Sequence, residues 1–211
     1  AVVEDIAPSA IKIGMLANEE VAMVVADALS RYNIPTILDP VMVSSSGHRL
    51  LSLDAQEVVK ERLLPLSTLV TPNIPEMEAL TAMSLTTAEE KLSAAKYLLS
   101  LGAQAVLLKG GHEEGDTKCD TLYQLDGSNI TQLHLSTPTV ATKNIHGTGC
   151  TLSSAIAAFM ARGLALREAV QEAKKYITEA ILSGADIAIG NGFGPVNHLF
   201  NPLPMQVYEE R

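Results

Sequence analysis

The sequence has few of the features that mark secreted, membrane-embedded or nucleic-acid-binding proteins. Its only two cysteines, Cys119 and Cys150, lie far apart without a CxxC motif, so we expect no disulfide framework and a reducing, cytoplasmic location. No run of Lys and Arg offsets the net charge of −9, which disfavours nucleic acid and the membrane surface as partners. No apolar run has the length of a membrane span, and the first residues do not resemble a signal peptide.

The sequence does have enough apolar residues for a sizeable core. They make up 47% of the 211 residues, against 18% that are charged. This length suits one α/β domain better than two. No internal repeat, low-complexity segment or linker divides the chain. We therefore expect a single domain over residues 1–211.

Short apolar runs alternate with helical patterns along the chain. The patterns predict strands over residues 10–16, 36–38, 68–71 and 105–108, and helices over 18–32, 54–64, from 76, 87–101, 149–163 and 166–182. This alternation is typical of an α/β fold with a mostly parallel central sheet and flanking helices. An Asp-Gly turn signal within residues 121–135 predicts an antiparallel hairpin at one side of the sheet.

Polar or glycine residues follow each predicted parallel strand. In open α/β sheets, ligands bind at the carboxyl ends of the strands. The residues expected there are Gly14 and Met15, Asp39, Asn73 with Glu76, and Lys109, together with the loop over residues 147–150. Their convergence at one edge of the sheet is stronger evidence for a site than any single motif.

The loop Gly147-Thr148-Gly149-Cys150 precedes an Ala-rich helical run. Backbone N–H groups at a helix N-terminus favour an anion, and a thiol there is more readily deprotonated. The loop is neither a P-loop nor a dinucleotide fingerprint, because GxxxxGK[ST] is absent and Leu152 occupies the third glycine position. The alternatives without a catalytic function are an ordinary glycine-rich helix start and a cysteine that is a small buried apolar residue.

His146 leaves two further readings of Cys150 open. The pair suits a nucleophilic Cys–His hydrolase, although that would not explain Asp39, Glu76 or Lys109. A metal site with His112 and Cys119 has poor spacing.

The charged residues at the strand ends suit phosphoryl transfer. Asp39 and Glu76 are candidate Mg²⁺ carboxylates acting through water, and Lys109 is a candidate for neutralising a transferred phosphate. The alternatives without a catalytic function are that the two carboxylates cap a loop and a helix, and that the lysine lies at the surface.

With these motifs in place, the chain resembles the hydroxymethylpyrimidine and phosphomethylpyrimidine kinases of thiamine biosynthesis, within the ribokinase-like superfamily. The matching segments are residues 11–16, 38–51, 71–80, 107–112 and 144–158. Most of the superfamily carries Asp where this chain has Cys150, and cysteine there is typical of these kinases and of a related pyridoxal-kinase branch. The resemblance implies a ribokinase-like α/β fold and the use of ATP and Mg²⁺.

The resemblance also implies a role for each site residue. Gly147, Thr148, Gly149 and the Cys150 N–H would form the anion hole, and the Cys150 side chain would accept the substrate's proton. The remaining roles are ATP binding by Lys109, Asn73 and Thr148, metal positioning by Asp39 and Glu76, and contact with the pyrimidine by Gly14, Met15 and Val41.

The family pattern includes a further N-terminal segment with a glycine-rich loop and much of the pyrimidine pocket. We therefore expect this chain to be N-terminally incomplete relative to its family. The alternatives are a pyridoxal or pyridoxine kinase and a catalytically silent ligand-binding fragment. Besides the small-molecule substrate and ATP, the resemblance favours a homodimer.

Overall fold

The computed structural model describes residues 1–42, 50–111, 115–127 and 129–204, and it has a single six-stranded sheet in the order β1-β2-β3-β4-β5-β6. The strands are β1 (Ile11–Ile13), β2 (Thr36–Leu38), β3 (Leu69–Val70), β4 (Ala105–Leu108), β5 (Thr117–Asp126) and β6 (Asn129–Pro138). The pairs from β1 to β4 are parallel, whereas β4–β5 and β5–β6 are antiparallel. The predicted mostly parallel sheet with one added hairpin is confirmed.

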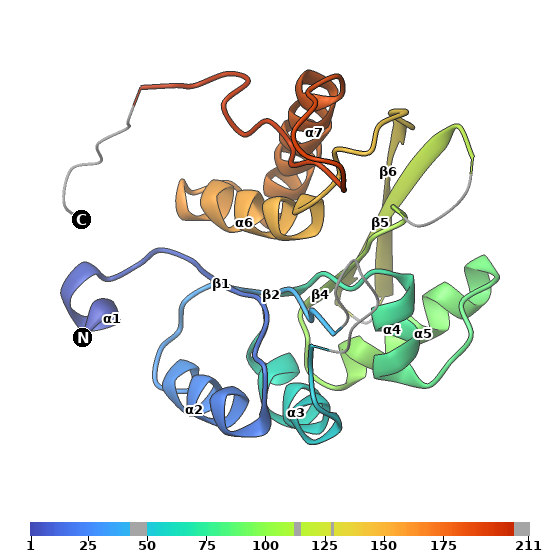
Figure 1. Ribbon diagram of the computed structural model, residues 1–211. Coiled ribbons are helices and arrows are strands. Elements are labelled where there is room, and N and C mark those ends of the chain that lie inside the picture. Colours follow the sequence, from blue (N-terminus) through green and yellow to red (C-terminus); the bar gives the residue numbers. More distant parts are fainter. Residues whose placement is uncertain (43–49, 112–114, 128, 205–211) are drawn as a thin grey trace.

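Helices cover both faces of this sheet (Figure 1). One layer contains α2 (Glu19–Leu29), α3 (Leu53–Val58), α4 (Ile74–Thr81) and α5 (Ala88–Ser100), and the other contains α6 (Thr148–Ala161) and α7 (Leu166–Gly184). Parallel strands in sequential order, joined by right-handed crossovers, place all their connecting helices on the same face. The opposite face is therefore left for α6 and α7, which follow the hairpin.

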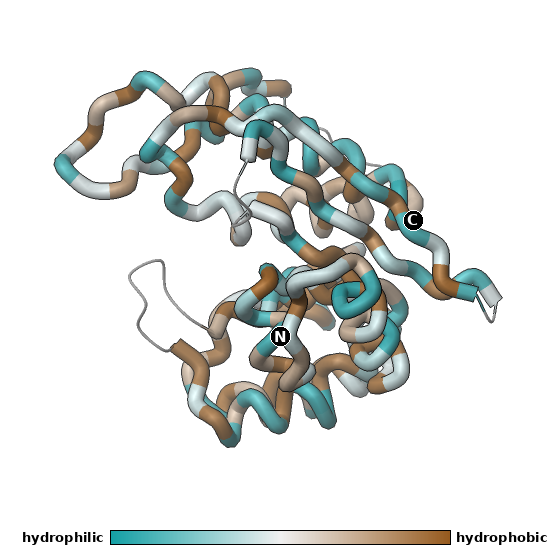
Figure 2. Tube along the Cα trace, turned by 90° about the vertical axis from the view of Figure 1, so that its right-hand side faces the viewer, coloured by the Kyte–Doolittle hydropathy of each residue, from teal (hydrophilic) through white to brown (hydrophobic). Residues whose placement is uncertain are grey.

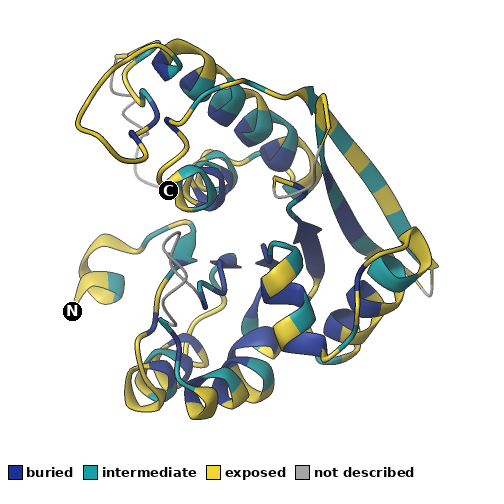
Figure 3. Cartoon of the chain, turned by 45° about the vertical axis from the view of Figure 1, so that its right-hand side comes forward, coloured by how far each residue is buried: buried dark blue, intermediate teal, exposed yellow. Residues whose placement is uncertain are grey.

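The strand pleat divides the core between these two layers. Ile37, Leu69 and Leu107 pack in one cluster with α6 and α7, whereas their neighbours Leu38, Val70, Val106 and Leu108 pack in the other. Successive side chains of a strand point to opposite faces, so the odd-numbered positions of β2, β3 and β4 face α6. The inner strands are buried throughout, as Figure 3 shows, while the far end of the hairpin is exposed.

Several local predictions can be compared with the elements. Asn18 and Thr87 cap α2 and α5 as expected, and Glu90 completes the capping box of α5. The predicted helix over 54–64 is α-helical only to Val58 and continues as a π-helical turn (Val59–Leu63) and a 3-10 turn (Leu64–Leu66). Pro65 within the last turn has no N–H to donate, which explains why regular α-helix does not continue there. The first residues form a short exposed helix, α1 (Val2–Ile6), which the sequence patterns did not predict.

Figure 2 shows the same chain coloured by hydropathy, with hydrophobic and hydrophilic residues alternating along much of the trace. No helix in the described part of the chain combines the length and apolar character needed to cross a membrane.

Candidate functional site

The pleat places three polar side chains beneath α6. Asp39, Thr71 and Lys109 each lie two residues beyond an apolar residue of the α6-facing cluster, namely Ile37, Leu69 and Leu107. The parallel register places Asp39 level with Thr71, whereas Lys109 lies opposite Asn73, two residues further along the same face. The long lysine side chain reaches back to Asp39, so the three side chains meet at the carboxyl end of the sheet. The expected convergence of the strand ends is therefore present for these residues.

Asp39 is the most enclosed member of the cluster, with a side chain only 1% exposed. Its Oδ1 lies 2.9 Å from the Lys109 Nζ and accepts a hydrogen bond from the Thr71 hydroxyl at 3.2 Å. Its Oδ2 accepts a hydrogen bond from Ser153 of α6 at 3.1 Å and lies 3.8 Å from the Lys12 Nζ. Both carboxylate oxygens are thus engaged, and Asp39 joins three strands to α6.

Lys109 lies between two carboxylates. Its Nζ is 3.7 Å from the Glu76 Oε2 as well as 2.9 Å from Asp39, and its side chain is 12% exposed. Burial lowers the pKa of Lys109, but the charges of Asp39 and Glu76, with a smaller contribution from Cys150, outweigh it, so the pKa is raised. The lysine is therefore a buried cation at neutral pH, held in place by its counter-charges.

Glu76 is the third residue of α4 and forms a capping box with Asn73. The Asn73 side chain accepts a hydrogen bond from the Glu76 N–H, and Glu76 Oε2 accepts one from the Asn73 N–H, both at 2.8 Å. Burial is the largest effect on the Glu76 pKa and raises it, against the opposing influence of Lys109. Asn73 also pairs with Lys109 in an isolated parallel bridge, which ties the start of α4 to the end of β4.

The predicted anion loop is the N-terminus of α6. Gly147 is the N-cap residue and adopts φ 84°, a left-handed conformation that favours glycine, and it contributes no side-chain cap. Among the described residues, neither the N–H of Gly149 nor that of Cys150 donates a backbone hydrogen bond to the residues before α6. A Cβ at position 149 would lie 3.4 Å from the Lys109 Nζ, so the loop directly overlies the lysine. An uncapped helix start beside a buried cation can bind an anion.

The candidate base and the alternatives to it can also be placed. Cys150 is exposed in the first turn of α6, and no hydrogen bond between described residues joins it to His146, which is also exposed. His112 lies outside the described residues. Within the described part of the chain, no three His, Cys, Asp or Glu side chains are grouped as a metal site. The geometry thus offers no support for the Cys–His or His–Cys metal readings.

The expected substrate contacts lie at the same edge of the sheet. Gly14 and Met15 follow β1 directly, and Met15 is 57% exposed. Val41 is half-buried just beyond Asp39, and its N–H donates to the Asp39 carbonyl at 2.8 Å. Their contact with a substrate stays a prediction.

The sequence reasoning missed Lys12, Thr71 and Ser153, all of which contact or approach Asp39. Lys12 lies between Ile11 and Ile13 on β1. Ile13 packs on the face away from α6, so the alternation of side chains along a strand could have placed Lys12 on the α6 face, where Asp39 lies. Ser153 follows Gly149 by four residues, one helical turn along the same face of α6.

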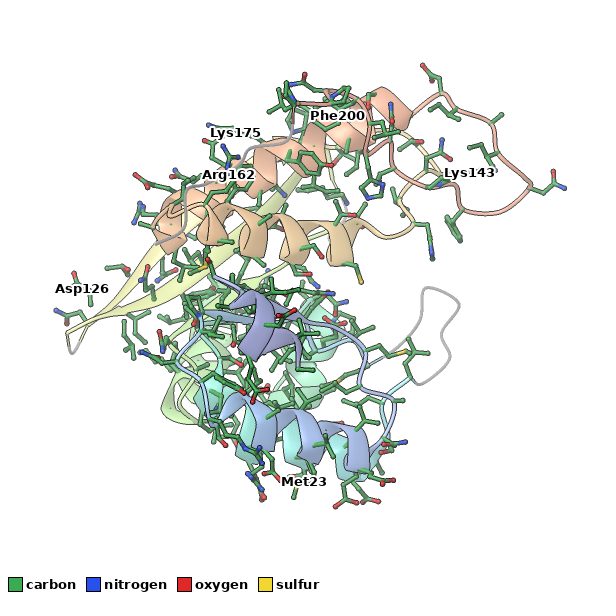
Figure 4. All side chains as sticks on the ribbon, turned by 90° about the vertical axis from the view of Figure 1, so that its left-hand side faces the viewer. Met23, Asp126, Lys143, Arg162, Lys175 and Phe200 are labelled. Carbon is green, nitrogen blue, oxygen red and sulfur yellow. The ribbon has the colours of Figure 1, made fainter. Side chains whose placement is uncertain are left out.

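A groove of about 720 Å³ lies beside the anion loop. One wall is formed by residues 141–144, which lead into α6, and the other by residues 185–192, which follow α7. Ile187 and Ile189 leave 43% and 60% of their surface exposed in the second wall. Figure 4 labels Lys143, which extends from the first wall. An apolar surface within reach of an anion-binding helix start suits a ligand with a flat ring and a charged group.

Comparison with known proteins shows the family to which the chain is similar. Residues 1–197 match the model of the phosphomethylpyrimidine kinase family. The hydroxymethylpyrimidine/phosphomethylpyrimidine kinase of Rhizobium meliloti is 42% identical over 199 residues, which cover 94% of this chain and 73% of the relative. The thiamine biosynthesis bifunctional protein ThiED of Geobacter sulfurreducens is 44% identical over 200 residues, 94% of this chain but only 40% of that protein.

Two solved structures extend the similarity to the fold. An ADP complex of Bacillus subtilis pyridoxal kinase has a TM-score of 0.80 at 33% identity, covering 90% of this chain and 70% of the other. The phosphomethylpyrimidine kinase of Clostridium difficile 630 has a TM-score of 0.70 at 39% identity, covering 85% and 72%. Fold and relatives together define an α/β phosphotransferase of the ribokinase-like class. Within that class, the chain belongs to the phosphomethylpyrimidine kinase family.

Proposed function

We propose that this chain transfers the γ-phosphoryl group of ATP to 4-amino-5-hydroxymethyl-2-methylpyrimidine or to its monophosphate. The observation that carries the proposal is the buried Lys109, 2.9 Å from Asp39 and directly beneath the uncapped N-terminus of α6. Phosphoryl transfer is catalysed mainly by positioning and by stabilising negative charge, and this arrangement presents a fixed cation and backbone N–H groups to one point.

In this proposal each site residue has a separate role. The N–H groups of Gly149 and Cys150, with Gly147 and Thr148, hold the transferred phosphoryl group, while Lys109 neutralises its charge. The Cys150 sulfur accepts the proton of the attacking hydroxyl or phosphate oxygen as the new P–O bond forms, and the bond to the ADP leaving group breaks. The phosphate chain of ATP also contacts Asn73, and the groove beside the loop takes its base.

The donor set can be tested for Mg²⁺. Asp39 is almost fully buried and both of its oxygens already contact lysines or hydroxyls, so it suits a second-layer role through water rather than direct ligation. Glu76, beside Asn73 at the start of α4, is the better placed carboxylate. Magnesium commonly binds through one or two carboxylates, waters and substrate phosphates, and it would supply positive charge to the ATP phosphates.

A pyridoxal kinase is the second candidate, and the higher TM-score of the Bacillus subtilis pyridoxal kinase is what favours it. Both substrates are aromatic rings that carry a hydroxymethyl group. The higher sequence identities belong to the pyrimidine kinases, which is why we place the pyrimidine first.

A substrate panel tests these proposals. ADP formation is measured with Mg²⁺ and ATP in the presence of the pyrimidine alcohol, its monophosphate or pyridoxal. We expect turnover with a pyrimidine to exceed turnover with pyridoxal. The reverse order would assign the chain to the second candidate, and no turnover by folded protein that binds ATP would indicate a silent binding module.

The same proposal includes a single domain over residues 1–211, a cytoplasmic location and a homodimer. Gel filtration with light scattering tests the last of these, and a monomer at micromolar concentration would contradict it.

A further inference from the structure

Asn144 is a buried amide whose side chain binds the far wall of the groove. Its Nδ2 donates hydrogen bonds to the carbonyl oxygens of Gly184 and Ile187, both at 2.7 Å, and lies 3.4 Å from the carbonyl oxygen of Ala185. The residue is 7% exposed. One side chain thus binds carbonyl groups at and just beyond the C-terminus of α7, where regular helical hydrogen bonding ends.

These contacts cross the groove at its base. Asn144 belongs to the segment that leads into the anion loop, whereas Gly184 to Ile187 begin the segment that forms the opposite wall. Thr142 reinforces the link, because its hydroxyl donates to the Ala185 carbonyl at 2.9 Å and accepts from the Asn144 N–H at 3.0 Å. The hydrogen bonds of Asn144 and Thr142 therefore fix the position of the wall that carries Ile187 and Ile189.

Gly194 shows how closely a third segment is fitted to the same side chain. A Cβ at position 194 would overlap the Oδ1 and Cγ of Asn144. The Gly194 carbonyl also accepts a hydrogen bond from the His146 N–H at 3.0 Å. Because Gly194 does not have a positive φ, the contact with Asn144 is the steric reason for glycine here.

We propose that Asn144 is a positioning residue that fixes the distance between the anion loop and the apolar wall, and so determines affinity for the base of the nucleotide. The inference rests on the proposed use of ATP. It assigns to Asn144 no contact with the phosphates and no part in proton transfer.

Two probes separate the base from the phosphates. ADP engages both the groove and the anion loop, whereas inorganic tripolyphosphate can engage only the loop. Calorimetry on Asn144→Asp and Asn144→Ala should show ADP affinity reduced on the order of tenfold, because two hydrogen bonds are lost, with tripolyphosphate affinity unchanged. Asn129→Ala, at an exposed position where β6 begins and outside the groove, is the matched control and should bind ADP as the wild type does.

A double-mutant cycle distinguishes the proposed positioning effect from a general loss of structure. Gly194→Ala should weaken ADP binding in the wild-type background but add little in the Asn144→Ala background, where the overlapping side chain is gone. Additive effects, or equal losses for ADP and tripolyphosphate, would overturn the inference. If the wild type bound neither probe, the proposed function would fail and this inference with it, whereas normal ADP binding by Asn144→Asp would refute the inference alone.

Discussion

The Lys109 ammonium lies 2.9 Å from the Asp39 carboxylate, although 70 residues separate them in the sequence. The contact forms because β3 holds β2 and β4 parallel and both residues lie on the α6-facing side of the sheet. Lys109 is two residues beyond the position level with Asp39, and its long side chain reaches back to the carboxylate. The contact also positions the lysine for the proposed reaction, because Lys109 lies directly under the anion loop.

Lys109→Met should separate the catalytic effect of this contact from its effect on stability. We expect turnover to fall on the order of 10²- to 10³-fold, because the cation that stabilises the transferred charge is lost. Unfolding free energy should fall by about 3–5 kcal/mol, since Asp39 and Glu76 are left as buried charges without their partner. Urea denaturation measures the second effect.

The double variant Asp39→Asn/Lys109→Met provides the control for stability. Removing the unpaired charge should recover part of the lost unfolding free energy but none of the turnover. Recovery of turnover in the double variant would show that Lys109 acts only by neutralising Asp39.

Glu76→Gln should change how stability depends on pH. Burial raises the Glu76 pKa above the ordinary 4.5, so between these two values the folded protein binds more protons than the unfolded chain. Unfolding free energy therefore falls as pH rises through this interval, and the full loss persists above the raised pKa. The glutamine keeps the capping geometry and does not titrate.

The measurement is urea denaturation of both proteins from pH 4.5 upward. As pH rises over the first part of the range, the unfolding free energy of the wild type should fall relative to that of Glu76→Gln. At higher pH the difference between the two unfolding free energies should stay constant. A wild type that gains on the variant as pH rises would mean that Lys109, not burial, dominates the Glu76 pKa.

Cys150→Ala should abolish turnover with little change in ADP affinity, because the thiol is assigned to proton transfer and the backbone N–H groups of the loop remain. Cys119→Ala is the matched control, since Cys119 is on β5, away from the loop, and should retain full turnover. Full activity in Cys150→Ala would refute the assignment of the base.

Lys174→Met should destabilise the protein by about 3–5 kcal/mol, whereas Lys175→Met should change stability by less than about 1 kcal/mol. Lys174 forms a 2.7 Å ion pair with Asp120, and the two side chains are only 13% and 5% exposed. Asp120 also accepts a hydrogen bond from the Gly110 N–H, next to Lys109. The neighbouring pair of Lys175 with Glu172 is exposed, so the two variants differ mainly in burial; equal effects would contradict this reading.

The mostly parallel sheet with its added hairpin, and the edge at which the candidate site lies, could be predicted from local patterns. The apolar runs, the capping residues Asn18 and Thr87, and the polar residues after each strand are all local signals. The positions of Asp39 and Lys109 needed only the further rule that parallel strands end at one edge.

The remaining contacts depend on pairings distant in sequence. Asp120 and Lys174 are 54 residues apart, and Asn144 and Gly184 are 40 apart. No local pattern specifies which carbonyl groups a buried amide will reach, or which acidic residue a half-buried lysine will pair with. Those choices follow from how α7 packs against the sheet and α6, which only the assembled tertiary structure determines.

The most direct test is transfer of the γ-phosphoryl group from radiolabelled ATP to 4-amino-5-hydroxymethyl-2-methylpyrimidine or its monophosphate by the 211-residue chain, with and without Mg²⁺. The account predicts labelled product that requires both the pyrimidine and Mg²⁺ and that is lost in Cys150→Ala and Lys109→Met. Label transfer that persists in both variants, or ATP cleavage that is independent of the pyrimidine, would contradict it.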